Sequence, residues 1–215
     1  MKQVYLIIMF VFVLVLIGYA SQQEGQKESG NKVLIILRES GETGDKELSS
    51  TKEAIEITRL LEEAGFQPVL ASASGRTFMG GSPPTSFKTL KLSKVKVSDY
   101  EAFMIPSDNR KSLYRDKENA SPEEISIVKQ AVDEGKLVAA QRWGVVVLAE
   151  AGVLEETQFA FPLNPQKDER FDNAIHIWSD EGPIVQDKNI ITSSQCPYAN
   201  PGIELTNALI AAFEE

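Results

Sequence analysis

Two hydrophobic patterns alternate along most of this chain. Residues 33–37 are apolar without interruption, which is typical of a strand buried on both faces of a parallel sheet. Between Ser50 and Gly65 the apolar residues instead recur every three or four positions, which predicts a helix. The same patterns predict further strands at 68–71, 102–105, 137–140, 174–177 and 189–192, and further helices at 121–135, 143–151 and 203–213. Strands and helices alternating in this way predict an α/β sandwich with a mostly parallel sheet.

The segments between these elements carry weaker patterns. Residues 72–86 contain three glycines and two prolines, so we expect a loop there. Residues 90–92 and 95–97 alternate between apolar residues and lysine, which favours a short exposed strand or hairpin. Residues 108–120 are rich in charge, and we expect an exposed insertion. The Ser-Pro-Glu-Glu sequence at 121–124 is a strong helix start, because it combines a capping serine with proline and glutamate at favoured positions.

The first twenty residues form a separate segment. Residues 4–17 are all apolar and follow Lys2, and Gly18-Tyr19-Ala20 supplies small residues for cleavage, as in a secretory signal peptide. The alternative is an uncleaved membrane anchor, because the apolar stretch reaches 17 residues when it is counted to Ala20, the lower limit for a span. Residues 21–31 contain no apolar residue and are expected to be a flexible linker. We therefore expect a domain over 32–215 that lies outside the cytoplasm, secreted or tethered to the membrane.

Composition excludes several classes of function. The chain has 22 Lys and Arg against 31 Asp and Glu, a net charge of −9, and no Lys/Arg cluster is expected to break this pattern. Such a surface repels phosphate backbones, so we expect no nucleic-acid partner. One cysteine and one histidine allow neither an intrachain disulfide nor a Cys/His zinc site. We expect no metal and no cofactor.

A series of short segments also occurs in a recognisable order. They are Ala64-Gly65-Phe66, Ala71-Ser72, Ser98 to Ala102, Met104-Ile105-Pro106, Ser121 to Glu124, Val138-Ala139-Ala140, Leu148 to Leu154 and Asn189 to Ser193. Together they resemble the ThiJ/PfpI family of the class I glutamine-amidotransferase-like superfamily, from about Lys32 to the C-terminus. The resemblance implies a flavodoxin-like three-layer sandwich that often forms a homodimer. It also implies activities of the peptidase, glyoxalase-like, deglycase or chaperone kind.

The resemblance locates the family's catalytic cysteine, and this chain lacks it. Family enzymes carry that cysteine at a tight strand-to-helix turn, in a pattern like Ala-Ile-Cys-His-Gly, where it is activated as a thiolate. Counting back from the matched segment at 148–154 puts Arg142 at the cysteine and Trp143 at the neighbouring histidine. A guanidinium group cannot act as a nucleophile or a general base at ordinary pH. Where family enzymes carry Gly-Gly to help form an oxyanion hole, this chain has Ser107-Asp108.

Three further residues are candidates for the site, each with two interpretations. The family register puts Glu53 beside the nucleophile, where we hypothesise an ion pair with Arg142. The local sequence Ser50-Thr51-Lys52-Glu53 fits a helix-capping box as well. His176 matches an auxiliary histidine of some family members, or it is a core or interface residue. Cys196 is either a relocated reactive thiol or a structural one.

These residues support three hypotheses of function. The first is an exported, non-catalytic domain that binds a small anionic ligand or a protein partner. The residues expected around its ligand are Glu53, Ser107, Arg142, Trp143 and His176. The second is an enzyme of altered chemistry, amidase/peptidase or glyoxalase/deglycase-like, which would use Glu53, His176 or Cys196. The third is a structural or chaperone-like dimer with a vestigial pocket.

Overall fold

The computed structural model describes residues 31–39, 45–80, 85–107, 110–165, 167–178, 183–196 and 199–214 of the 215-residue chain. From Asn31 onward the chain forms one compact unit. The expected leader at 1–20, the expected linker up to residue 30, and Asp108 lie outside the described residues. Within the described residues, no helix combines the length and the apolar character needed to cross a bilayer.

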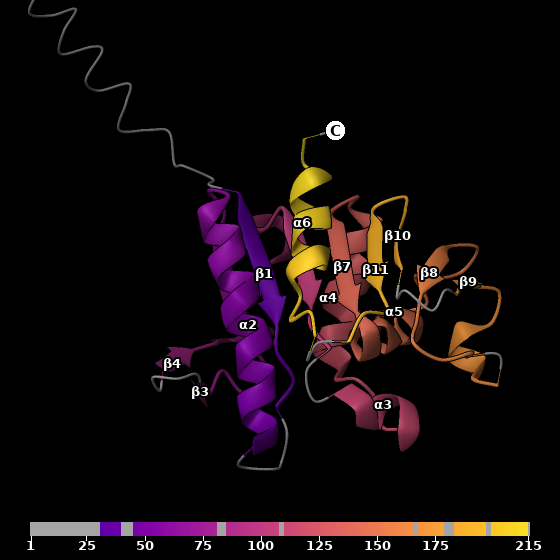
Figure 1. Cartoon of the computed structure of the whole chain (residues 1–215), viewed down its shortest axis with the longest axis horizontal. Helices are drawn as coiled ribbons and strands as arrows, with labels where there is room; N and C mark the ends of the chain where they lie inside the picture. The colour runs from indigo at the N-terminus through magenta and orange to yellow at the C-terminus, as the bar shows by residue number, and fades with distance from the viewer. Residues whose placement is uncertain are drawn as a thin grey trace, which may run out of the picture. The chain divides into compact units, whose positions relative to one another are not determined.

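A seven-stranded sheet in the order β10-β11-β7-β6-β1-β2-β5 forms the centre of this unit (Figure 1). Its strands are β1 (Lys32–Ile36), β2 (Gln67–Ser72), β5 (Leu90–Lys91), β6 (Ala102–Ile105), β7 (Leu137–Gln141), β10 (Ile184–Asp187) and β11 (Ile190–Ser193). Every neighbouring pair is parallel except β10 and β11, which are antiparallel. The predicted α/β fold with a mostly parallel sheet is therefore confirmed.

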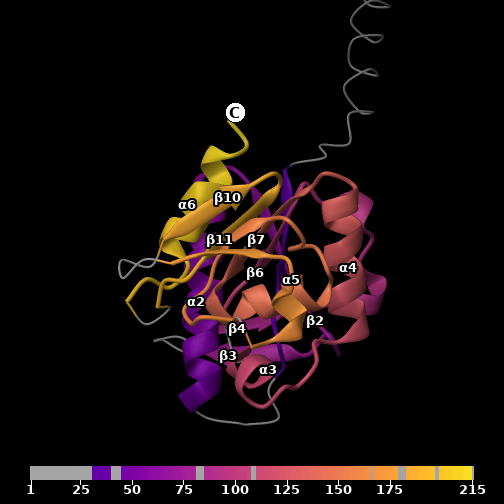
Figure 2. The same cartoon turned by 90° about the vertical axis from the view of Figure 1, so that its right-hand side faces the viewer.

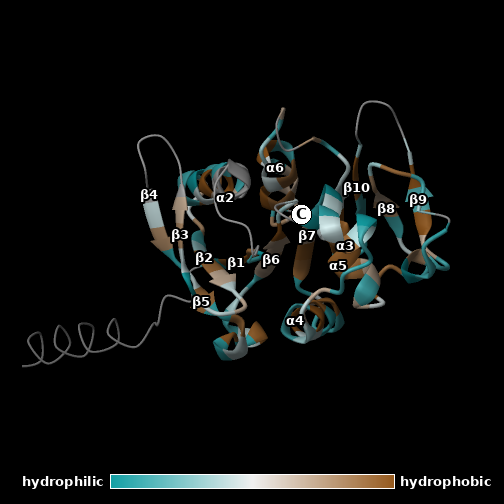
Figure 3. Ribbon diagram, turned by 90° about the horizontal axis from the view of Figure 1, so that it is seen from below, coloured by the Kyte–Doolittle hydropathy of each residue, from teal (hydrophilic) through white to brown (hydrophobic). Residues whose placement is uncertain are grey.

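Helices cover both faces of the sheet, which makes three layers (Figures 2 and 3). Helices α2 (Asp45–Glu63) and α6 (Ile203–Ala211) lie together on one face, and α4 (Pro122–Asp133) and α5 (Val145–Glu150) lie on the other. The alternating side chains of the buried strands point into two hydrophobic cores, one under each pair of helices. A short helix, α3 (Lys111–Arg115), precedes α4.

Two small strand pairs lie outside the central sheet. Strands β3 (Thr77–Gly80) and β4 (Thr85–Lys88) form an antiparallel hairpin, and β8 (Gln158–Ala160) pairs in parallel with β9 (Ile175–Ile177). The expectation of a loop at 72–86 is therefore wrong for 77–80 and 85–86, whereas residues 81–84 lie outside the described residues. Phe78 is almost fully buried and stacks on Phe87 at a ring-centroid distance of 5.9 Å, and this packing outweighs the glycines and prolines.

The N-terminus of α2 differs from its prediction. The helix begins at Asp45, five residues before the expected start at Ser50. Glu53 therefore lies in the third turn of the helix, so it is not the acid of a capping box. The predicted start of α4 is confirmed, because Ser121 Oγ accepts the Glu124 N–H at 3.1 Å and Glu124 Oε2 accepts the Ser121 N–H at 3.0 Å.

The charged segment before α4 is exposed over much of its described length, as expected, but buried residues anchor it. Arg110 and Leu113 have no exposed surface at all, and the segment includes helix α3. Charge content alone indicated exposure, because a buried arginine is unusual unless it has a partner. Here Arg110 Nη2 pairs with Glu124 Oε1 at 2.6 Å.

Candidate functional site

The turn between β7 and α5 has the geometry expected of a nucleophile position. Strand β7 ends at Gln141, a single 3-10 turn spans Arg142–Gly144, and α5 begins at Val145. Arg142 has a φ of 48°, in the left-handed region that disfavours side chains. This sharp turn, which we call the elbow (Arg142–Gly144), projects residue 142 from the carboxyl end of the sheet.

Close packing against the neighbouring strand holds the elbow in place. A Cβ atom at Gly144 would collide with the carbonyl oxygens of Ile105 and Pro106, at the end of β6. Only glycine allows this approach of two backbones. In the sequence, this glycine is the last residue of Ala140-Gln141-Arg142-Trp143-Gly144.

The guanidinium group of Arg142 has no anionic partner within the described part of the chain. It forms no ion pair and no hydrogen bond there, and its Nε atom is buried without a partner. The side chain is half-buried and lies over the ring of Trp143, with Cζ 5.3 Å from the ring centroid. A guanidinium carries five N–H donors in a planar fork that matches a carboxylate or a phosphate.

Glu53 lies near the end of β6 rather than against Arg142. The residue is 1% exposed, and Oε1 accepts the backbone N–H of Ser107 at 2.9 Å. Ser107 is equally buried. The hypothesised ion pair between Glu53 and Arg142 is therefore not formed. The Ser107 amide is bonded to a carboxylate and does not point at a substrate position.

Trp143 anchors an aromatic cluster beside the elbow. Its ring packs edge-on against Phe161 and at a tilt against Tyr114, with 5.7 Å between centroids in each pair. The side chain is only 8% exposed. Trp143 therefore fills space in the core behind Arg142, where family enzymes carry a polar histidine.

His176 belongs to the same aromatic region but does not reach Arg142 or Glu53 through any contact in the described residues. Its Nε2–H donates to the carbonyl oxygen of Phe161 at 3.0 Å, and its ring lies 5.3 Å from that of Phe159. It is half-buried on β9. These contacts are those of a satisfied structural histidine.

The loop that carries Cys196 lies against the residue before the elbow. Gln141 is buried, and its Nε2 donates to the carbonyl oxygens of Gln195 at 3.3 Å and Asn200 at 3.1 Å. Cys196 itself is exposed. Sequence reasoning missed Gln141, because a glutamine at the end of a strand carries no distinctive pattern.

A buried ion pair lies at the same end of the sheet. Sequence reasoning also missed this pair. Arg110 Nη2 donates to the carbonyl oxygen of Ile36, the last residue of β1, at 3.1 Å and to Glu124 at 2.6 Å. Burial alone raises the pKa of Glu124. The Arg110 charge and the hydrogen bonds from Ser121 and Arg110 outweigh burial, so the pKa of Glu124 is lowered.

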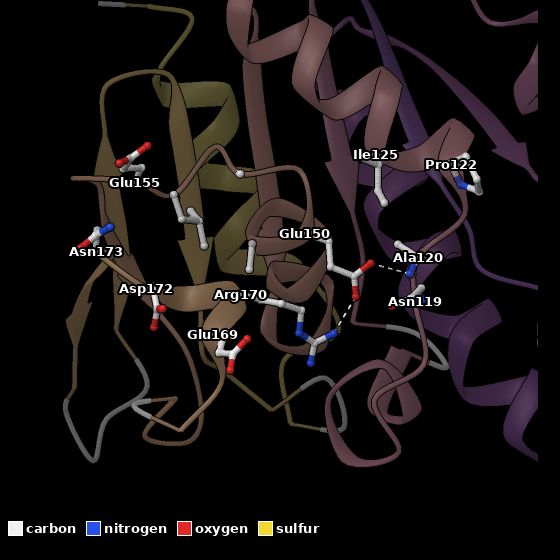
Figure 4. A pocket seen from close by; sticks show the side chains of 13 residues that line it. Asn119, Ala120, Pro122, Ile125, Glu150, Glu155, Glu169, Arg170, Asp172 and Asn173 are labelled. Carbon is white, nitrogen blue, oxygen red and sulfur yellow. Dashed lines mark hydrogen bonds and ion pairs between the residues drawn. The ribbon is translucent and has the colours of Figure 1, made fainter.

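An open cavity of about 730 Å³ lies at the far end of α5 from Arg142, and Figure 4 shows it. In that view the Glu150 carboxylate lies between the Arg170 guanidinium and the Ala120 amide, which bind it at 2.6 Å each. Arg170 also binds Asp168 and the Leu113 carbonyl oxygen. The cation of this cavity is thus neutralised by the protein. Within the described residues, no group of His, Cys, Asp and Glu side chains is arranged to hold a metal ion.

Comparison with known proteins identifies relatives of the whole domain. The model of the DJ-1/PfpI family matches residues 31–211. A ThiJ/PfpI domain protein from Brachyspira murdochii superposes with a TM-score of 0.65 at 22% identity, over 86% of this chain and 97% of that one. DJ-1beta of Drosophila melanogaster has a TM-score of 0.61 at 19% identity, over 84% and 89%.

A larger relative contains the same domain. A two-domain protein from Anabaena variabilis, with DJ-1/ThiJ/PfpI-like and ferritin-like domains, has a TM-score of 0.64 at 26% identity. The match covers 86% of this chain and 48% of that one. A search of curated proteins gives no match.

Proposed function

We propose that this chain, which belongs to the DJ-1/PfpI family, binds a small anionic ligand at the elbow and lacks the cysteine chemistry of family enzymes. We further propose that the domain lies outside the cytoplasm, secreted or tethered by its N-terminal apolar segment, and that it acts as a homodimer. Light scattering of the purified protein tests the dimer.

The observation that carries the proposal is the unpaired guanidinium of Arg142. The group is half-buried at the elbow, and within the described residues it has neither an ion pair nor a hydrogen bond. Partial burial weakens competition from water, so a carboxylate bound by two N–H donors gains more there than on an exposed surface. A monocarboxylate or dicarboxylate of few carbon atoms is the simplest ligand of this chemistry.

Two features argue against the usual family reaction. Arginine at the nucleophile position cannot attack a carbonyl. The Ser107 amide, at the position where family enzymes form part of an oxyanion hole, donates to Glu53 instead. The site would therefore supply neither a nucleophile to form an oxyanion nor this backbone N–H to stabilise it.

Thermal unfolding with formate, acetate, succinate or inorganic phosphate tests anion binding. A ligand at ten times its Kd stabilises the native state by about 1.4 kcal/mol, which raises the Tm of a domain of this size by roughly 3–6 °C. Arg142→Gln should remove the shift. Arg115→Gln is the matched control, because Arg115 is exposed on α3 and has no ion pair within the described residues. A shift that survives in Arg142→Gln would refute the proposal.

The alternative function is an enzyme of altered chemistry that uses Glu53, His176 or Cys196. The nearly complete burial of the Glu53 carboxylate favours it, because buried carboxylates are common acids and bases in active sites. Methylglyoxal turnover and peptide hydrolysis should be assayed in the parent, Glu53→Gln and Arg142→Cys. Under our proposal the parent is inactive in both assays. Activity in the parent that disappears in Glu53→Gln would establish the alternative.

A further inference from the structure

The chain has an acidic net charge, but one segment of it is basic. No Asp or Glu occurs between Glu63 and Asp99, and the segment carries one arginine and four lysines. The whole chain, in contrast, carries −9. The expectation that no basic cluster breaks the acidic pattern is therefore wrong. We call Lys88, Lys91, Lys94 and Lys96 the basic edge.

The fold places these lysines on or next to the outer edge of the central sheet, because Lys91 lies on β5, Lys88 ends β4, and Lys94 and Lys96 follow β5. Strand β5, which contains Lys91, is the terminal strand, and Figure 3 shows it beyond β2 on the side of the β3–β4 hairpin. From Leu90 to Val97 the apolar side chains pack into or against one core, while Lys91, Lys94 and Lys96 are exposed between them. This alternation leaves these three lysines exposed to solvent.

Among the residues that the structure describes, the lysines of the basic edge have no partners. Within the described residues, no side chain of the basic edge forms an ion pair or a hydrogen bond, although other lysines do. The four charges lie within nine residues of the sequence. Four unneutralised charges on a sheet edge attract an extended anionic surface more than a single small anion.

The basic edge leads back to the start of the domain. After Lys96 the chain returns to the amino end of β1, where the Glu101 N–H donates to the carbonyl oxygen of Lys32 at 2.8 Å. The sequence before Lys32 consists of 11 polar or glycine residues and, before them, the apolar segment at 4–20. Eleven residues span at most about 40 Å. A chain anchored by its first residues would therefore keep the basic edge within reach of the bilayer.

We infer that the basic edge binds the anionic lipid headgroups of the membrane surface. The inference rests on the membrane placement in the proposed function, and not on the ligand at the elbow. Lysine ammonium groups suit this role, because they act as point charges toward lipid phosphates and do not require fixed bidentate geometry. The domain outside these four lysines has a net negative charge, and we call it the acidic remainder.

Lysine labelling of the full chain tests the inference. The chain is incorporated into vesicles of phosphatidylcholine alone or with about 30% phosphatidylglycerol, and acetylation of each lysine is measured by mass spectrometry. We expect the acetylation rates of the basic edge to fall at least five-fold with phosphatidylglycerol and to recover in 0.5 M NaCl, where charge is screened. Lys52, Lys111, Lys129 and Lys167 are exposed elsewhere and should not change.

A set of variants separates this inference from its competitors. Replacement of the four edge lysines by glutamine should lower co-sedimentation of the chain with anionic vesicles, and the same change at the four control lysines should not. Each lysine near an anionic bilayer contributes about a five-fold gain in partitioning, so a loss of tenfold or more is expected. Equal loss in both variants would overturn the inference, because net charge alone would then explain it.

Two other outcomes would also overturn it. One is equal protection in vesicles without phosphatidylglycerol. The other is protection of the same lysines by duplex DNA at a matched phosphate concentration, which would indicate a nucleic-acid surface. The Arg142→Gln variant should behave like the parent, so a failed ligand at the elbow leaves this result unaffected. If the chain does not insert, the same labelling with added vesicles still decides between the outcomes.

Discussion

Arg142 holds a backbone conformation that costs free energy for any residue with a Cβ atom. Its φ of 48° is left-handed, and the cost is about 1–2 kcal/mol. The contact of Gly144 with the end of β6 enforces the turn, so the strain persists although no cysteine requires it. The elbow therefore belongs to the fold, and the chemistry of the position depends only on the side chain placed there.

The strain gives a prediction for residue 142 that does not depend on any ligand. Arg142→Gly should stabilise the domain by about 0.5–1 kcal/mol, or roughly 1–4 °C in Tm, because glycine relieves more strain than it loses in chain entropy. Arg142→Ala retains the Cβ atom and should give no such gain. Calorimetry of the two variants measures the difference, and equal stabilities would show that the turn is unstrained.

At this scale the sequence predicted positions better than contacts. The structure places Arg142 and Trp143 in the turn after β7, and Glu53 on α2 with its carboxylate bonded at the end of β6. The family register could not predict the partner of Glu53, because the Ser107 amide is 54 residues away and the bond depends on how α2 packs over β6. Nor could it predict that Arg142 has no ion pair among the residues that the structure describes.

At the scale of elements, one carboxylate joins two parts of the structure. Glu124 closes the capping box of α4 and also pairs with the fully buried Arg110, which in turn binds the end of β1. The capping box was visible as Ser-Pro-Glu-Glu. The pairing of Glu124 with Arg110 was not predictable, because Arg110 lies in a segment whose charge suggested exposure.

Removing one member of this buried pair should be costly. Arg110→Met leaves the Glu124 carboxylate buried without its cation, and we expect a loss of about 3–5 kcal/mol in the free energy of unfolding. Arg110→Met with Glu124→Gln should recover part of that loss, because the amide is neutral and can still accept the Ser121 N–H. Urea denaturation of Arg110→Met, Glu124→Gln and the double variant gives the coupling free energy between the two residues. A single-variant loss below about 1 kcal/mol would contradict this account.

The short turn before β9 supplies a pH-dependent stability. Hydrogen bonds from Arg170 and then Lys117 hold the pKa of Asp168 well below its usual range. A lowered pKa in the folded state means that this stabilisation is complete above the unfolded pKa of about 3.9, and is lost as the pH falls below it.

Asp168→Asn should therefore flatten the acid side of the stability profile. In urea denaturation between pH 6 and pH 3, the parent should lose free energy of unfolding more steeply than Asp168→Asn, and the two curves should converge at low pH. Asp172→Asn is the control, since Asp172 is exposed and has no ion pair within the described residues. Parallel curves for the parent and Asp168→Asn would show that the Arg170 and Lys117 contacts contribute nothing.

The prediction of elements failed where tertiary packing overrides local signals. The β3–β4 hairpin lies in a segment rich in glycine and proline, and it is held by Phe78 in the α2 core. Strands β8 and β10, with three and four residues, contain polar residues, so neither shows the unbroken apolar run that marks the four-residue strand β6. The long apolar runs were predicted well, because burial on both faces leaves only apolar residues.

At the scale of the molecule, the fold was predictable from the short segments that resemble the family. These segments include positions where the backbone conformation admits few residue types. Gly65 and Gly152, which lie within two of the segments, have φ values of 84° and 69° that other residues rarely adopt. The sequence predicted the net charge but not its distribution over the surface. The separation of a basic edge from an acidic remainder requires knowing which residues share a surface.

This separation predicts an unusual salt dependence of membrane binding. The domain from Asn31 onward carries the full −9, because the first 30 residues contain two acidic and two basic residues. In 0.01 M salt the Debye length is about 30 Å, so an anionic bilayer is repelled by the acidic remainder as well as attracted by the basic edge. Near 0.1 M it shortens to about 10 Å, and the attraction of the nearest charges dominates.

Binding should therefore pass through a maximum rather than fall steadily with salt. We expect protection of the basic edge in phosphatidylglycerol vesicles to rise from 0.01 to about 0.1 M NaCl and to disappear by 0.5 M. The variant with glutamine at the four edge lysines should show no maximum, while the variant at the four control lysines should keep it. A steady decrease from the lowest salt would mean that the acidic remainder does not oppose the surface, and that the domain approaches it in another orientation.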